Sequence, residues 1–369
     1  MKKIIVFIFL CASNISFSSG LKGELYVMGD SLSDTGAALG ASNMILNSPD
    51  LNNVKPLLFF FGINQVAHEI SLGDQPYYKK RSFTDGEVAI EVLARKLDKK
   101  ITPAFNLSHL EYKIPFLDFI PPIKFSEIRK KGNNYAIIGA KAAMGSSKLD
   151  QYLLNYISLE KQVDALLKDH QTEIKSKDDV FILMIGSNDI IFAENFTNIY
   201  DAVTGIHNAL LRLYNSGARN FMVFNAPDPS KTPQFANDNI KKIEVANFTE
   251  YFNSELDKKL KKFMSNHSDA KVIDVNLHKI FQDLLSDAKA KGMNISEACI
   301  SNIVNQNYAQ KDIIDIVKSG KLSSSYNIGC SEDNMKKYFY FDSLHPTKWV
   351  HEELGNKMYE MIGSVAEIN

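Results

Sequence analysis

Ser31, Asp342 and His345 have the residue types of a nucleophilic ester hydrolase, although they lie at opposite ends of the chain. Ser31 is part of the stretch GDSLSDTG (29–36), and the other two belong to YFDSLHPT (340–347). Serine hydrolysis needs a nucleophile, a base that takes its proton and a carboxylate that orients the base. A bend between Asp342 and His345 would let the carboxylate hold one imidazole nitrogen while the other meets Ser31. A turn serine and an ordinary histidine before a helix remain the alternatives on these residues alone.

Two further loops carry groups that can stabilise an oxyanion. Gly139 ends the apolar run 134–138, and Asn188 lies in GSND (186–189) directly after another apolar run. A glycine lets the backbone N–H approach a substrate closely, and an asparagine amide offers a further donor. Taken singly, Gly139 is typical of a turn and Asn188 of a turn or helix cap. Together with the Ser31 N–H they make a candidate oxyanion hole.

The elements that must position these residues alternate along the chain. Apolar runs predict strands at 24–29, 134–138, 180–185, 221–224 and 271–275, and the run 180–185 has the pattern of a strand buried on both faces. Spacings of three and four predict helices at 86–97, 159–167, 201–214 and 240–263 and one beginning near Lys348. This order predicts a doubly wound α/β fold with a mostly parallel sheet, and the loops at its carboxyl edge carry the chemistry.

Composition excludes some classes of function. The chain has 369 residues, a formal net charge of -1 and 23% charged residues, which gives no reason to expect a nucleic-acid partner. We find no phosphate-binding glycine loop and no histidine or cysteine spacing typical of zinc, so neither cofactor nor metal is predicted. His351 is the rival base to His345, but no carboxylate is spaced to orient it.

The N-terminus resembles a secretory signal. Two lysines precede a short apolar core and small residues, so residues 1–18 are predicted to be a signal peptide and 19–369 a single exported domain. Removal of Cys11 leaves Cys299 and Cys330, which are expected to form a disulfide that closes the loop 299–330. That polar loop lies in a stretch, 289–337, with few strand signals. An insertion near 40–75 contains LLFFF (57–61), either a buried strand or a patch that admits acyl chains.

The combined motifs resemble the GDSL (SGNH) lipase and esterase family. The matching stretches are GDSL (29–32), NYAIIG (134–139), GSND (186–189) and DSLHP (342–346). RSFTDGEVAIEVLA (81–94) and NAPD (225–228) are most similar to the branch of bacterial phospholipases A, lysophospholipases and glycerophospholipid:cholesterol acyltransferases. The resemblance implies a flavodoxin-like three-layer α/β/α hydrolase with Ser31 as nucleophile, His345 as base and Asp342 as its orienter. It also implies an oxyanion hole of Ser31, Gly139 and Asn188, although Ile138 replaces a glycine frequent in the branch.

The expected function is that of an exported hydrolase of phospholipid or lysophospholipid acyl esters. Water would normally release the acyl group, and a sterol could accept it instead. Such a protein would contact a membrane surface transiently and act in the periplasm or outside the cell. The same fold and triad serve short-chain and carbohydrate acetylesterases, which remain the main alternative. A binding protein that has lost catalysis is the alternative from another class.

Overall fold

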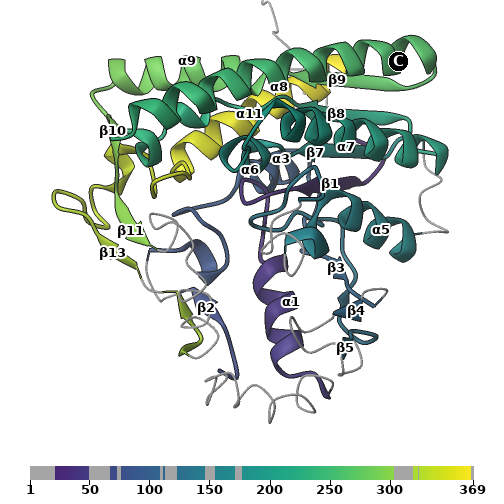
Figure 1. Ribbon diagram of the computed structural model, residues 1–369, viewed down its shortest axis with the longest axis horizontal. Coiled ribbons are helices and arrows are strands. Elements are labelled where there is room, and N and C mark those ends of the chain that lie inside the picture. The colour runs from purple at the N-terminus through teal and green to yellow at the C-terminus, as the bar shows by residue number, and fades with distance from the viewer. Residues whose placement is uncertain are drawn as a thin grey trace, which may run out of the picture.

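The centre of the molecule is a parallel sheet of four strands in the order β1-β7-β8-β9 (Figure 1). The computed structural model describes residues 21–49, 67–72, 76–108, 111–112, 123–145, 154–170, 177–302, 319–322 and 324–366. The four strands are Leu25–Gly29, Val180–Met184, Asn220–Phe224 and Lys271–Val275. They match four of the five predicted strands, and the doubly wound α/β class is confirmed.

The fifth predicted strand, 134–138, extends the sheet without becoming a regular strand. Val27 N–H donates to the Asn133 carbonyl at 2.8 Å, and Tyr135 N–H donates back to Val27 at 2.8 Å. Ile137 N–H reaches the Gly29 carbonyl at 3.2 Å. This segment therefore lies alongside β1, and the loop that follows it leaves the sheet beside the end of β1.

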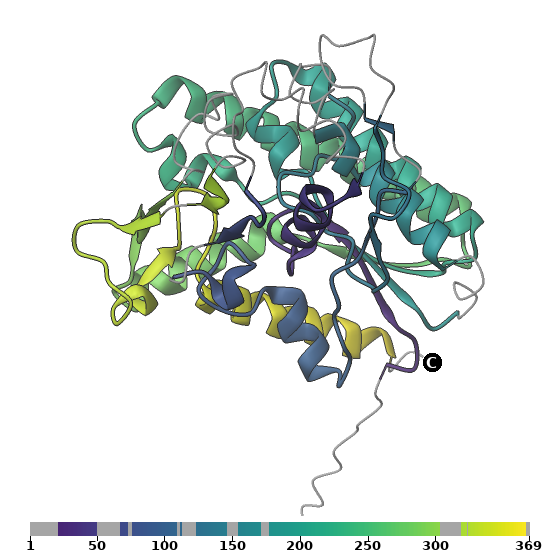
Figure 2. The same cartoon turned by 90° about the horizontal axis from the view of Figure 1, so that it is seen from below.

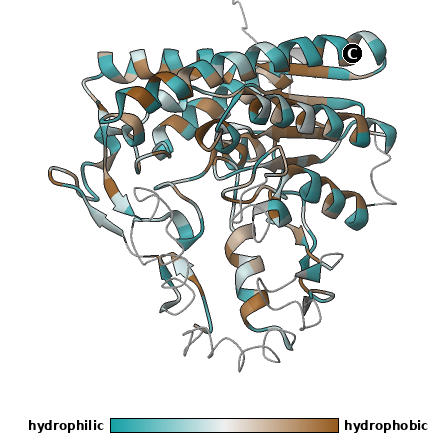
Figure 3. Ribbon diagram, in the orientation of Figure 1, coloured by the Kyte–Doolittle hydropathy of each residue, from teal (hydrophilic) through white to brown (hydrophobic). Residues whose placement is uncertain are grey.

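Helices cover both faces of the sheet, which gives three layers (Figure 2). One face packs against α5 (Leu159–Asp169), α7 (Phe196–Asn215) and α8 (Asn239–Asn266), and the other against α3 (Ala89–Lys96), α9 (Leu277–Ala290) and α11 (Lys348–Ala366). Alternate residues of β7 divide between the two cores: Phe181 and Leu183 face the first set, and Ile182 faces the second. The apolar colour of the strands in Figure 3 reflects this burial on both sides.

Five helices lie where periodicity predicts them, and their ends follow from capping. The Asn195 side chain accepts from the N–H groups of Thr197 and Asn198, so α7 begins five residues before the predicted start. Asp238 caps α8 through the Lys241 N–H at 2.9 Å. The helix α9 is not among the predicted elements. Its buried residues at 277, 280, 284 and 288 have helical spacing, so a local signal for this helix was missed. The helix lines part of the site described below.

Small elements surround the carboxyl edge of the sheet. Besides α1 (Ala37–Leu46) they are the short strands β2 (Ser71–Leu72), β3 (Phe105–Asn106), β4 (Glu111–Tyr112), β5 (Ile123–Lys124), β6 (Arg129–Lys130), β10 (Asn294–Ala298), β11 (Ile300–Asn302), β12 (Lys321–Leu322), β13 (Ser324–Tyr326) and β14 (Tyr338–Tyr340). The described part of 289–337 contains β10 to β13 although its sequence has few strand signals, because polar strands that pair in twos carry no apolar run. The stretch near 40–75 begins inside α1, and β2 pairs in parallel with β12. Residues 57–61 lie outside the described part of the chain.

A disulfide joins Cys299 and Cys330, as predicted, with 5.3 Å between their Cα atoms. The bond ties the start of β11 to the turn that follows β13. Among the described helices, none combines the length and the apolar character that a membrane crossing needs.

Candidate active site

The loops after β1 and β14 bring Ser31, His345 and Asp342 into one hydrogen-bonded chain. Ser31 Oγ lies 2.7 Å from His345 Nε2, although the two residues are 314 positions apart. His345 Nδ1 lies 2.9 Å from both carboxylate oxygens of Asp342. A proton on Nδ1 bonds to the carboxylate and leaves Nε2 free to accept the serine proton. The structure therefore gives the three residues the geometry of a nucleophile, a base and its orienter.

Asp342 is fully buried, and several hydrogen-bond donors stabilise its negative charge. Oδ1 accepts from the N–H groups of Leu344 at 2.9 Å and His345 at 2.7 Å, and Oδ2 accepts from the Asn302 amide at 2.9 Å. Burial alone would raise the pKa of this carboxyl group, but His345 and these hydrogen bonds outweigh it and hold the pKa below its usual value. Asp342 therefore stays ionised beside the imidazole.

The loop that carries Ser31 is held by buried polar side chains. Gln162 on α5 accepts from the Gly29 N–H at 2.8 Å and donates to the Gly29 carbonyl at 2.9 Å, which fixes the end of β1. Asn134 donates to the Ser33 carbonyl at 2.8 Å. Asp34 accepts from the N–H groups of Gly36 at 2.7 Å and Ile138 at 3.0 Å. Asp34 thus links the serine loop to the loop of Gly139.

The other two oxyanion candidates are joined by a hydrogen bond between their loops. Asn188 lies in α6 (Ser187–Ile191), and its amide donates to the Ala140 carbonyl at 3.0 Å, next to Gly139. An asparagine amide has two donors, so this bond leaves one for a substrate. Gly139 adopts a φ of 78°, a conformation that favours glycine. Of the described residues, Ser31 and Asn188 line the hollow beside the triad, whereas Gly139 is not part of its lining.

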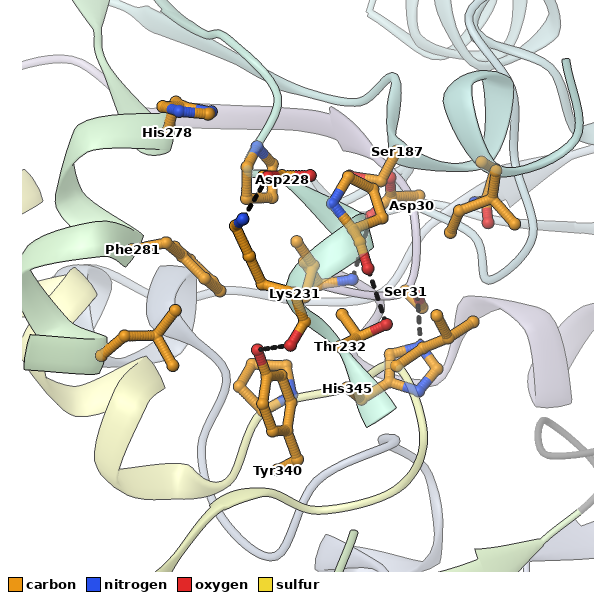
Figure 4. Close-up of a pocket in the computed structure, with 18 of the residues that line it drawn as sticks. Asp30, Ser31, Ser187, Asp228, Lys231, Thr232, His278, Phe281, Tyr340 and His345 are labelled. Carbon is orange, nitrogen blue, oxygen red and sulfur yellow. Dashed lines mark hydrogen bonds and ion pairs between the residues drawn. The ribbon is translucent and has the colours of Figure 1, made fainter. Parts of the chain in front are cut away.

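A hollow lined by apolar and polar side chains opens beside Ser31 and His345 (Figure 4). Phe281 and His278 of α9 lie across it from Ser31, and Lys231 and Tyr340 line it between them. Tyr340 donates to the Lys231 carbonyl at 3.1 Å, which holds the loop after β8 against β14. The apolar lining consists of Leu32, Ile191, Pro227, Pro229, Phe281, Leu285, Leu344 and Pro346. We refer to the part of this lining that α9 contributes, Phe281 and Leu285, as the apolar wall.

Comparison with known families decides the class of protein. The family model for the GDSL-like lipases and acylhydrolases matches residues 25–358, which include every residue of the site. The chain belongs to this family. It is therefore a carboxylic ester hydrolase by family, and the three-layer fold is the one that the sequence resemblance implied.

Two relatives of this GDSL-like acylhydrolase indicate how far the similarity extends. The thermolabile hemolysin of Vibrio parahaemolyticus is 26% identical over 202 residues, which cover 52% of this chain and 43% of the hemolysin. A GDSL esterase/lipase of Arabidopsis thaliana (At3g50400) is 24% identical over 364 residues, or 90% of this chain and 86% of the plant protein. The chain thus spans less than half of the hemolysin but most of the plant protein.

His351, the rival base, has a different place in the acylhydrolase. It is buried between α11 and α3, where its Nδ1 accepts the Ala89 N–H at 3.3 Å. Burial and the nearby His345 lower the pKa of His351 to about 3, so it stays neutral. The structure does not bring it to the hollow. Within the described chain, no three histidine, cysteine or acidic side chains gather as a metal site.

Several supporting residues were missed by the sequence analysis. Gln162 has a faint signal, because it is a polar residue on the face of the predicted helix 159–167 that should be buried. Asn302 has none, since it lies in a polar stretch about forty positions before its partner Asp342. Phe281 was missed together with α9. These roles depend on which segments meet in three dimensions.

Proposed function

We propose that this acylhydrolase cleaves the acyl ester of phospholipids or lysophospholipids through an acyl-enzyme on Ser31. The observation that carries the proposal is the chain of contacts from Ser31 through His345 to Asp342, 2.7 and 2.9 Å long, at the mouth of a hollow with an apolar wall. Each contact has the length of a productive hydrogen bond before proton transfer.

The proposed reaction has two halves. Ser31 Oγ attacks the ester carbonyl carbon as its proton passes to His345 Nε2, and Asp342 stabilises the imidazolium. The N–H groups of Ser31 and Gly139 and the Asn188 amide stabilise the oxyanion. The imidazolium then protonates the leaving alkoxide as the ester bond breaks. Water attacks the acyl-enzyme in the same way, which releases the fatty acid and restores Ser31.

The choice of a lipid substrate is supported by the hollow and by one relative. Phe281 and Leu285 of α9 form the apolar wall, where an acyl chain would lie. The hemolysin of Vibrio parahaemolyticus is named for the lysis of red cells, an effect that acyl hydrolysis of membrane lipids can produce. We further propose export after removal of residues 1–18, transient contact with a membrane surface, and a sterol as a possible acyl acceptor.

The first experiment compares the mature protein with Ser31→Ala on lysophosphatidylcholine, with and without cholesterol. We expect fatty acid release that the variant lowers by at least about 10³-fold. Cholesteryl ester that appears as fatty acid falls would add acyl transfer. Lipid left intact while p-nitrophenyl acetate is hydrolysed would favour a short-chain or carbohydrate acetylesterase. Failure of an active-site serine phosphonate to label the wild type would favour a binding protein.

A second variant tests the apolar wall. Phe281→Ser should raise KM for long-chain esters by about 10-fold, because roughly 1–3 kcal/mol of apolar contact is lost. Hydrolysis of p-nitrophenyl acetate should change less than about 2-fold. Lys279→Ser, on the exposed side of the same helix, is the matched control. Equal effects of Phe281→Ser on short and long esters would contradict an acyl site along α9.

A further inference from the structure

The buried carboxylate of Asp342 has a side-chain donor outside the loop that carries it. Its Oδ1 accepts hydrogen bonds from the N–H groups of Leu344 and His345, which belong to the same loop. Its Oδ2 meets the imidazole and, from β11, the Asn302 amide at 2.9 Å. Asn302 is itself 5% exposed, and its amide also reaches the Tyr77 hydroxyl at 3.1 Å. The bond to Oδ2 is therefore sheltered from water.

The register of β11 determines where Asn302 lies. Cys299 N–H donates to the Tyr340 carbonyl at 3.1 Å, and Ile300 N–H donates to the Phe341 carbonyl at 2.8 Å. These two bonds pair the start of β11 with the residues directly before Asp342. A strand alternates its side chains, so Asn302 follows Ile300 on one side. This pairing therefore places the Asn302 amide next to the Asp342 carboxylate.

The disulfide holds the same end of β11. Cys299 is the residue before β11, and its disulfide with Cys330 ties that strand to the turn after β13. The strands β11 and β13 lie side by side (Figure 1). Asn327 N–H donates to the Cys299 carbonyl at 2.9 Å, and Cys330 N–H donates to Asn327 at 3.0 Å. On the other side, Asn302 pairs with Ser324 of β13. Covalent and hydrogen bonds therefore fix the strand that carries the amide.

We propose that Asn302 is a positioning residue of the triad, and that the Cys299–Cys330 disulfide keeps it in contact with Asp342. Asn302 is not among the residues that line the hollow, so its effect on the reaction would pass through the Asp342 carboxylate. The proposal rests on the proposed roles of Ser31, His345 and Asp342. It assigns to the disulfide a part in catalysis, in addition to its part in stability.

Loss of the amide has a definite consequence for the reaction. Oδ2 would keep the imidazole but lose its second donor. Because a buried carboxylate that lacks hydrogen bonds is costly, Asp342 would turn toward another donor and leave the line to His345. The imidazolium that forms during acylation would then be stabilised less. The rate of the chemical step should fall, whereas binding of the ester in the hollow should not change.

The test compares Asn302→Ala with Asn294→Ala, which removes an exposed amide bond to the Glu297 carboxylate on β10. For Asn302→Ala we expect kcat on lysophosphatidylcholine to fall roughly 10- to 100-fold, the range for one hydrogen bond to a charged group. KM should stay within about 2-fold, and the acidic limb of the kcat/KM profile should move to lower pH. Asn294→Ala should keep the wild-type kcat and profile.

Two further variants keep the test decisive if Asn302→Ala folds poorly. Asn302→Asp places a second carboxylate beside Asp342 and should be more damaging than alanine near neutral pH. The double variant Cys299→Ser/Cys330→Ser should lower kcat in the same direction but less, with the same shift of the acidic limb. Titration with an active-site serine phosphonate gives the folded fraction for each rate.

The outcomes separate this inference from the proposed function. An unshifted pH profile in Asn302→Ala, with a rate that follows only the folded fraction, would overturn the positioning role. A wild-type kcat and profile in the double cysteine variant would overturn the role of the disulfide. Retention of activity by Ser31→Ala would instead overturn the proposed function itself. The expected result is an inactive Ser31→Ala beside an Asn302→Ala variant that is slow and shifted in pH.

Discussion

His345 and His351 lie six positions apart, yet their surroundings give them opposite roles. The Nε2 of His345 faces Ser31, whereas His351 accepts a backbone N–H inside the contact between α3 and α11. We expect His345→Ala to lower kcat by at least about 10³-fold. His351→Ala should keep kcat of the folded protein within about 3-fold and lower the free energy of unfolding by roughly 1–3 kcal/mol. Steady-state rates and urea unfolding check the pair, and a large loss of kcat in His351→Ala would contradict the assignment.

Asp30, next to the nucleophile, gives a prediction about pH. Its burial raises the pKa of the carboxyl group to about 7, although the Leu32 N–H and His345 oppose the shift. Between about pH 4 and 7 the folded state binds more protons than the unfolded state, so Asp30 lowers stability as the pH rises. Asp30→Asn removes this cost and keeps an oxygen for the Leu32 N–H.

The difference in unfolding free energy between Asp30→Asn and the wild type should therefore grow with pH. We expect it to be near zero at about pH 4 and on the order of a few kcal/mol at pH 8. Urea unfolding across this range measures it. Asp287→Asn, on the exposed face of α9, is the control and should give parallel curves. Parallel curves for Asp30→Asn as well would show that the carboxylate is not desolvated as described.

At the scale of elements, Gly186 controls where α6 begins. It has a φ of 130°, and a Cβ there would lie 2.4 Å from the Phe252 ring of α8. Gly186→Ala should cost at least about 2 kcal/mol of stability through backbone strain and this clash. It should also lower kcat, because Asn188 would move with α6. Gly363→Ala, with no atom near its added Cβ, should change stability by less than about 1 kcal/mol.

The helices and strands also show how much of the fold and of the site can be predicted from the sequence alone. Strands such as β7 and helices such as α8 follow from local apolar patterns, and the triad follows from residue types in a characteristic order. The positions of Asn302 and Phe281 do not, because they depend on which distant segments pair. Asn302 meets Asp342 only because β11 is in register with the chain before Asp342. A polar strand carries no periodic signal that would reveal this partner.

At the scale of the whole molecule, the site draws on segments from both ends of the chain. Ser31 follows the first strand of the sheet, whereas Asp342 and His345 precede the last helix. The contacts among them have high sequence separation, so they form only after distant parts of the chain have come together. Short strands outside the central sheet also connect distant segments, as the parallel pair of β2 and β12 does. Global stability and the geometry of the triad are therefore coupled.

Removal of the disulfide tests whether the stability of the whole molecule depends on the region beside the triad. It closes a loop with a sequence separation of 31, and in the chain-entropy model such a link stabilises the folded state by about 3 kcal/mol. Cys299→Ser/Cys330→Ser should therefore lower the urea midpoint of the sheet, measured by circular dichroism, with an equal or steeper slope because the unfolded chain becomes less compact. The start of the loop, Cys299 and Ile300, bonds to the backbone of Tyr340 and Phe341, so its release should loosen the chain directly before Asp342 as well. An unchanged midpoint would mean that the region near the disulfide unfolds by itself, independently of the sheet.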